Sequence, residues 1–146
     1  MHTPEKHVLK DFNNKVVVID TNDNSIETIL TVGDVPNSIV SDSSGNLWVL
    51  CSGKPSYADV ETAGYLYKIV PGNNSLSFFE YQNTEHPSLL NSDSGMLYYS
   101  LNGKVFKMDE TDGDLPSEPI QGLGGFYRSM AIQNGELFAT DPGDYA

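Results

Sequence analysis

The chain repeats itself, and this repetition limits the folds open to it more than any other feature of the sequence. Leu47 recurs as Leu97 and again as Leu137, at spacings of 50 and 40 residues. Each leucine lies in a unit that reads as a strand, a tight turn ending in glycine, and a second strand. The copies of this unit occupy residues 36–49, 87–99 and 128–139.

A second unit alternates with the first. Its first strands contain Ile19, Ile69 and Met108, which are 50 and 39 residues apart. In each copy, turn residues follow and another strand is expected, over residues 25–32, 75–81 and 119–121. Because two independent landmarks give nearly the same pair of spacings, the repeat is a property of the fold and not an accident of composition.

A period of 40 to 50 residues with four strands per unit is typical of a β-propeller blade. Short runs of Val, Ile, Leu, Tyr and Phe alternate with turn residues, and no long segment has a helical period. The sequence therefore predicts an all-β fold of four-stranded antiparallel blades, with strands a to d counted outward from the channel. The predicted parts are an irregular N-terminal segment (1–14) and a repeat region (15–146) that holds a c–d hairpin (15–32), a blade (36–81), a second blade (87–121) and an a–b hairpin (128–140).

These parts amount to twelve strands, or about three blade equivalents cut out of phase. The first hairpin lacks an a–b partner and the last lacks a c–d partner. The chain is thus expected to be either an incomplete propeller or half of a ring that a second copy closes. Between strands b and c of the first full blade, eleven extra residues form an insertion within residues 51–64.

Several motifs resemble a known propeller repeat. The segments Val-x-Ile-Asp-Thr-Asn at residues 17–22, residues 29–39 and Gly-Asn-Leu-Trp-Val at residues 45–49 are similar to the YVTN-type repeat of surface-layer-like and cell-surface proteins. Residues 50–55 resemble the exported propeller lipoproteins of Gram-negative gut bacteria. The resemblance implies a propeller fold and a place at the cell surface or in the periplasm. It also implies a binding role, since some of those propellers capture cobalamin for a transporter.

The charge of the chain excludes some partners. Twenty acidic and eight basic residues give a net charge of −12, which repels nucleic acid and anionic membrane surfaces. No apolar run approaches the roughly 20 residues of a membrane-spanning helix, and the first residues do not read as a signal peptide. The single cysteine, Cys51, is expected to be a buried apolar residue without a disulfide partner.

Candidate binding residues lie on the loops expected at one rim, where strands b and c and strands d and a of successive blades connect. Loops on a rigid scaffold carry function, and exposed aromatic side chains beside polar groups make a usable binding surface. The candidates are Asn37, Tyr57, Glu61, Glu85, His86, Tyr127, Arg128, Asp141 and Tyr145. For Tyr57 and Tyr145 the alternative is that each packs against its own loop.

Two of these candidates suggest more specific chemistry. Arg128, the only arginine, is suited to a ligand carboxylate or phosphate, although the sequence slightly favours an ion pair or a stack on Tyr127. Glu85 and His86 suggest a metal-assisted lyase or lactonase, because histidine titrates near neutrality. Only one histidine lies in the repeat region, and the acidic residues 109–114 do not match a calcium loop.

The sequence therefore predicts a non-enzymatic recognition module without metal or cofactor. Its expected partner is a small molecule, a glycan or a surface protein, and a homodimer is the expected way to complete the ring. The lyase or lactonase and a purely structural surface protein are the alternatives. Trp48, Tyr98 and Phe138 share one repeat position and are expected to pack between blades.

Overall fold

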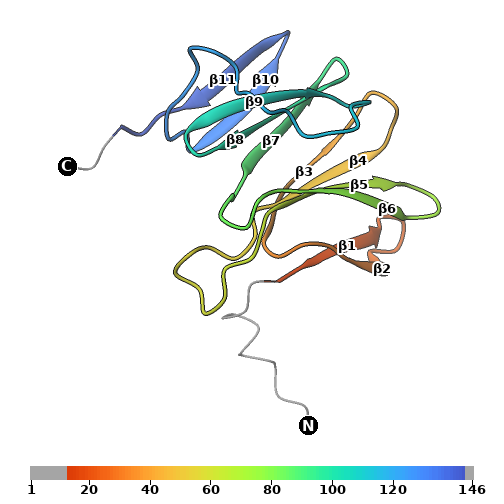
Figure 1. Cartoon of the computed structure of the whole chain (residues 1–146). Coiled ribbons are helices and arrows are strands. Elements are labelled where there is room, and N and C mark those ends of the chain that lie inside the picture. Colours follow the sequence, from red (N-terminus) through yellow and green to blue (C-terminus); the bar gives the residue numbers. More distant parts are fainter. Residues whose placement is uncertain (1–12, 144–146) are drawn as a thin grey trace.

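The computed structural model describes residues 13–143, and this part of the chain contains eleven β-strands and no helix (Figure 1). The strands are β1 (Lys15–Asp20), β2 (Ser25–Thr31), β3 (Pro36–Ser41), β4 (Leu47–Cys51), β5 (Tyr65–Val70), β6 (Ser75–Glu80), β7 (Ser88–Asp93), β8 (Met96–Leu101), β9 (Lys104–Asp109), β10 (Ser129–Gln133) and β11 (Glu136–Thr140). The prediction of an all-β fold is confirmed. Of the segment predicted to be irregular, residues 1–14, all but the last two lie outside the described residues.

The strands form four small antiparallel sheets. The largest has the order β3-β4-β5-β6, the next has the order β7-β8-β9, and β1–β2 and β10–β11 are separate hairpins. The first strands of successive sheets lie side by side, β3 against β7 and β7 against β10. Figure 1 shows the sheets one beside the next, with the two hairpins at opposite ends.

Tight turns close the hairpins as the glycine positions predict. In the turn between β10 and β11, Asn134 and Gly135 have φ angles of 52° and 77°. Positive φ at both central residues of a two-residue loop gives the strands the twist that they need to pair, and asparagine and glycine adopt it most readily. The spacing of these turns thus determines where each strand begins and ends.

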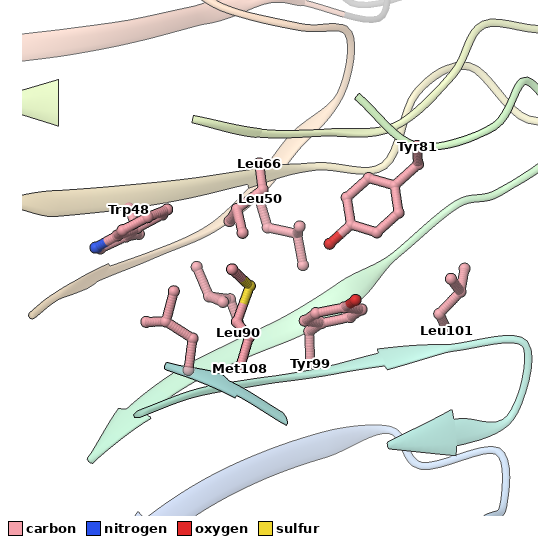
Figure 2. Packing of buried hydrophobic residues seen from close by; sticks show 9 residues of the cluster. Trp48, Leu50, Leu66, Tyr81, Leu90, Tyr99, Leu101 and Met108 are labelled. Atoms are coloured by element: carbon pink, nitrogen blue, oxygen red, sulfur yellow. The ribbon is translucent and has the colours of Figure 1, made fainter. Parts of the chain in front are cut away.

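The main core lies between the four-stranded and the three-stranded sheet. Alternation along β4 places Trp48 and Leu50 on the face that meets the three-stranded sheet. Figure 2 shows Trp48, Leu50 and Leu66 across from Tyr99 and Met108. Burying a large apolar side chain contributes about 1.5–3 kcal/mol, so this cluster carries much of the stability. Its buried members are Trp48, Leu50, Leu66, Tyr81, Leu90, Leu97, Tyr99, Leu101 and Met108.

A second core lies on the opposite face of the four-stranded sheet. Here Val49, Cys51 and Ile69 are buried together with Val32, and side chains of the β1–β2 hairpin such as Leu30 pack against them. The expectation that Cys51 is a buried apolar residue is confirmed, since none of its surface is exposed. Each face of this sheet therefore has its own neighbour.

Burial predicts that Cys51 is unreactive while the protein is folded. Burial, with a smaller effect of the nearby Asp34 carboxylate, raises the pKa of the Cys51 thiol to about 12. The thiolate is the reactive form, so at pH 8 its fraction falls about a thousandfold relative to a thiol at its ordinary pKa. We expect a thiol reagent to label the urea-unfolded chain at least about a hundred times faster than the folded one. Equal labelling rates would contradict the buried position.

The second predicted blade, 87–121, has three strands and not four. Residues 119–121 do not form the expected outer strand; Ile120 donates a single backbone hydrogen bond to the carbonyl of Val105, and Gly124 makes an isolated bridge to Lys104. Proline has no N–H to donate to a ladder, and glycine weakens a strand. Pro116 and Pro119, followed by several glycines, explain why this segment stays irregular.

The predicted packing position shared by three aromatic residues is only partly correct. Trp48 is buried and Tyr98 is half-buried, but Phe138 is exposed. The reason is that a further sheet or hairpin follows β4 and β8 and covers the face on which Trp48 and Tyr98 lie. Within residues 13–143 no further strand follows β11 to cover Phe138. The prediction for Phe138 is therefore wrong within a single chain.

Candidate functional site

The long loop between β4 and β5, residues 52–64, is fastened to the turn before β3. Ser52 N donates to Val35 O and Gly53 N to Asp34 O, both at 2.9 Å. The Thr62 hydroxyl donates to the Asp34 carboxylate at 2.9 Å and accepts from Lys54 N at 2.8 Å. Backbone and side-chain hydrogen bonds therefore hold both ends of this loop, which allows it to present side chains in fixed positions.

His86 joins this loop to the connection between β6 and β7. Its Nδ1 lies 2.6 Å from Ser52 O, and its Nε2 lies 2.8 Å from Glu61 Oε1. A carbonyl and a carboxylate oxygen both accept hydrogen bonds, so both contacts are made in full only when both ring nitrogens carry protons. His86 thus has an oxygen partner at each ring nitrogen, and its contact with Glu61 is half-buried.

Glu85, the other predicted partner of His86, has a different role. Its Oε1 accepts a hydrogen bond from Gln82 N at 3.0 Å, and its carbonyl accepts one from Gly64 N at 3.2 Å. These contacts close the turn 82–85 and tie it to the end of the long loop. The carboxylate that meets His86 is that of Glu61, which is 25 residues away in the sequence.

A hollow of about 190 Å³ opens beside His86, and Tyr127 lines it from the segment before β10. The Tyr127 hydroxyl donates to Gly124 O at 3.1 Å, which fixes the ring against its own loop. Phe126 is almost fully exposed at the mouth of the hollow. The lining residues are His86, Ser88, Ser100, Leu101, Asn102, Gly103, Gly125, Phe126 and Tyr127.

The remaining candidates lie apart from this group. Asn37 has a structural contact, since its Nδ2 donates to Pro87 O at 3.2 Å and links β3 to the start of β7. Tyr57 is exposed on the long loop. Asp141 accepts from Gly143 N at 2.8 Å, and the exposed Arg128 makes no ion pair within residues 13–143. Tyr145 lies outside the described residues.

The structure therefore brings Glu61, His86 and Tyr127 to one place and leaves Tyr57, Arg128 and Asp141 outside it. Sequence reasoning missed Ser88 and Ser100, which add hydroxyl groups to the hollow from β7 and β8. The sequence could have indicated both serines, because Ser88 begins β7 and Ser100 lies near the end of β8, beside the predicted binding loops. It also missed the Asp34 carboxylate, which holds the long loop.

A second cavity, of about 390 Å³, lies between the four-stranded and three-stranded sheets. Tyr81, Tyr99 and Phe106 line it together with Glu80 and Glu85. The Tyr81 hydroxyl is buried without a hydrogen-bond partner among the described residues, and burial raises its pKa. Figure 2 shows this hydroxyl directed into the apolar cluster, so it belongs to the core and not to an open site.

Within residues 13–143, no three acidic, histidine or cysteine side chains gather as metal ligands, and no helix is long and apolar enough to cross a membrane.

Comparisons with other proteins add no family assignment. A scan against protein-family models finds no match to the chain, and a search of curated proteins finds none either.

Proposed function

We propose that the four-stranded and three-stranded sheets are blades of a β-propeller and that the two hairpins are parts of further blades. We also propose that the protein is a recognition module that binds a neutral sugar in the hollow beside His86. The side-by-side first strands β3, β7 and β10 support the architecture, because the innermost strands of successive propeller blades are neighbours around the channel. The likeness to exported surface propellers supports a place at the cell surface or in the periplasm. The connections around His86 then form the rim of the propeller.

The chemistry of the hollow is the observation that carries the sugar proposal. Exposed Phe126 and half-buried Tyr127 offer ring faces, while Ser88, Ser100 and Asn102 lie beside them. Apolar ring faces with a few convergent hydroxyl and amide groups suit a ligand that has both apolar C–H faces and hydroxyl groups. The net charge of −12 disfavours anionic ligands, so a neutral sugar fits better than a phosphate or an acidic sugar.

The same geometry supports binding over catalysis. A general base needs a nitrogen that is free to take a proton from the substrate. Both ring nitrogens of His86 are already occupied, by Ser52 O and by Glu61. The role that this contact suggests for His86 is to hold the long loop against the hollow, so that the binding surface is formed before the ligand arrives.

The proposal predicts that Phe126→Ala weakens sugar binding about tenfold or more without unfolding the protein, because truncation of a residue that anchors a ligand costs about 2 kcal/mol or more. Neutral oligosaccharides would be screened on an array, and the best one measured by calorimetry. Phe78→Ala is the matched control, since Phe78 is an exposed phenylalanine on β6, away from the hollow.

Two results would count against this function. If no neutral sugar binds at millimolar concentration, a structural surface protein becomes the better explanation. If a sugar binds but both phenylalanine variants bind it equally well, the binding surface lies elsewhere on the molecule.

A further inference from the structure

Equivalent positions of the repeat are buried in the middle of the molecule and exposed at its two ends. Ile69 on β5 and Met108 on β9 are 1% and 2% exposed, whereas Ile19, their counterpart on β1, is 55% exposed. Side chains at this position face the preceding sheet. Within residues 13–143, no strand precedes β1, and its apolar face is therefore open.

The same contrast recurs at two further positions. Trp48 on β4 is 1% exposed, but its counterpart Phe138 on β11 is 56% exposed. Leu90 on β7 is 4% exposed and packs in the cluster that contains Trp48, but its counterpart Ile39 on β3 is 53% exposed. In the middle of the molecule, Trp48 and Leu90 pack in the same cluster. Their counterparts Phe138 and Ile39 lie at opposite ends of the chain, and each is exposed.

The strand edges are complementary in the same way. In the four-stranded sheet, β4 pairs with β5. By repeat position β11 corresponds to β4, and β1 corresponds to β5. In the described part of the chain, however, β11 pairs only with β10 and β1 only with β2. One end of the molecule therefore presents an unpaired second strand, and the other end presents an unpaired third strand.

We propose that two copies of this chain associate through these edges. β11 of each copy pairs with β1 of the other, so that a composite sheet β10-β11-β1-β2 forms twice in the dimer. Each composite sheet repeats the order of the observed four-stranded sheet, and the two copies together close a six-bladed ring. This inference depends on the blade arrangement proposed above and not on the sugar site.

The register of the new pairing follows from two pairings within the chain. Leu47 lies opposite Ile69 in one sheet, and Leu97 lies opposite Met108 in the other. Transferred to the composite sheet, this register places Leu137 opposite Ile19 of the second copy. Four residues after Leu137, just past the end of β11, the same register places Asp141 opposite Lys15.

That last pair joins opposite charges, since Asp141 and Lys15 would lie directly across from each other, which is favourable in an antiparallel pair. At the start of β11 the same register places Glu136 opposite Asp20, two like charges, so the pairing depends mainly on the apolar side chains between these two positions. The pairing also has space to form: an open cavity of about 340 Å³ lies between β1 and β3, lined by Val16, Val17, Ile39 and Val49 among others. β11 and Phe138 of the second copy would fill it, as β4 and Trp48 fill the corresponding place against β7.

Light scattering on a size-exclusion column tests the proposal directly. We expect a particle of twice the 16.0 kDa chain mass. Phe138→Ala should weaken the dimer at least about tenfold, as expected for a central aromatic contact. Phe78→Ala should leave it unchanged, although Phe78 is 55% exposed and Phe138 is 56% exposed.

A charge exchange tests the register. Asp141→Lys places two lysines opposite each other and should weaken the dimer, while the double variant Asp141→Lys, Lys15→Asp should restore it. A monomer at every concentration, equal effects of the two phenylalanine variants, or no rescue by the double variant would each overturn the proposal. A monomer that still binds sugar would overturn the dimer but leave the proposed sugar binding intact. A dimer that binds no sugar would support the dimer and overturn the proposed sugar binding.

Discussion

Replacing Gly53 with alanine is expected to destabilise the fold by about 3 kcal/mol or more and to detach the long loop from its support. Gly53 has a φ of +73°, and a Cβ atom there would lie 2.2 Å from Thr62 O and 2.5 Å from Ala63 O. Both oxygens belong to the backbone of the same loop, so neither can move without breaking the hydrogen bonds to Asp34. Urea unfolding followed by circular dichroism would measure the loss.

Gly45→Ala is the matched control for this prediction. Gly45 also has a positive φ, +86°, but nothing lies within 4 Å of the position that a Cβ would take. Replacing Gly45 with alanine should therefore lower the stability of the fold by only about 1 kcal/mol, the cost of holding a residue with a Cβ atom in the left-handed region. If the two variants lose equal stability, the cost at Gly53 is conformational alone, and the close contact with the loop has no consequence.

The Gly53 variant also tests how the proposed site is assembled. Glu61 reaches His86 only because the loop lies against the turn at residues 33–35. Once the loop is displaced, the hollow loses the wall that the contact between His86 and Glu61 supports. Sugar affinity should therefore fall together with stability, although Gly53 itself does not line the hollow.

The strands and turns could be predicted from sequence because their signals are local. Alternating apolar residues and a turn such as Asn134–Gly135 determine a hairpin within about a dozen residues. The spacing of Leu47, Leu97 and Leu137 then shows which hairpins correspond. The strand expected over residues 119–121 is absent for a reason that is also local, since Pro116 comes shortly before it and Pro119 is its first residue.

The candidate site was harder to predict because its contacts join distant residues. Glu61 and His86 are both among the predicted binding residues, but adjacency in the sequence suggests Glu85 as the partner of His86. The actual partner is set by how the long loop folds back, and this depends on the bonds of Asp34 to Thr62 and Gly53. No periodic pattern encodes such a contact, so the path of a loop of this length does not follow from the sequence alone.

Trp48→Ala is expected to produce the other large effect, a loss of about 3–5 kcal/mol. Trp48 is buried in the main core, where its ring stacks on Phe79 at 6.4 Å between centroids and lies 5.3 Å from the Lys68 ammonium. Its Nε1 donates to Asp42 Oδ2 at 2.9 Å. Because Trp48 is the only tryptophan, unfolding would be followed by circular dichroism and not by fluorescence. A loss below about 1 kcal/mol would contradict its place in the core.

Trp48→Phe separates packing from the hydrogen bond and adds a pH dependence. Partial burial disfavours the Asp42 carboxylate, but hydrogen bonds from Trp48 and from the backbone of Asn46 outweigh it and lower the pKa of Asp42 below its usual value of 3.8. A lowered pKa in the folded state stabilises the protein above pH 3.8, and this contribution disappears as the pH falls through the folded-state value. Without the indole N–H the pKa rises toward its usual value. The phenylalanine variant should therefore lose about 1–2 kcal/mol at pH 7 and less than that at pH 3. A deficit that is the same at both pH values would show that Asp42 does not contribute through its charge.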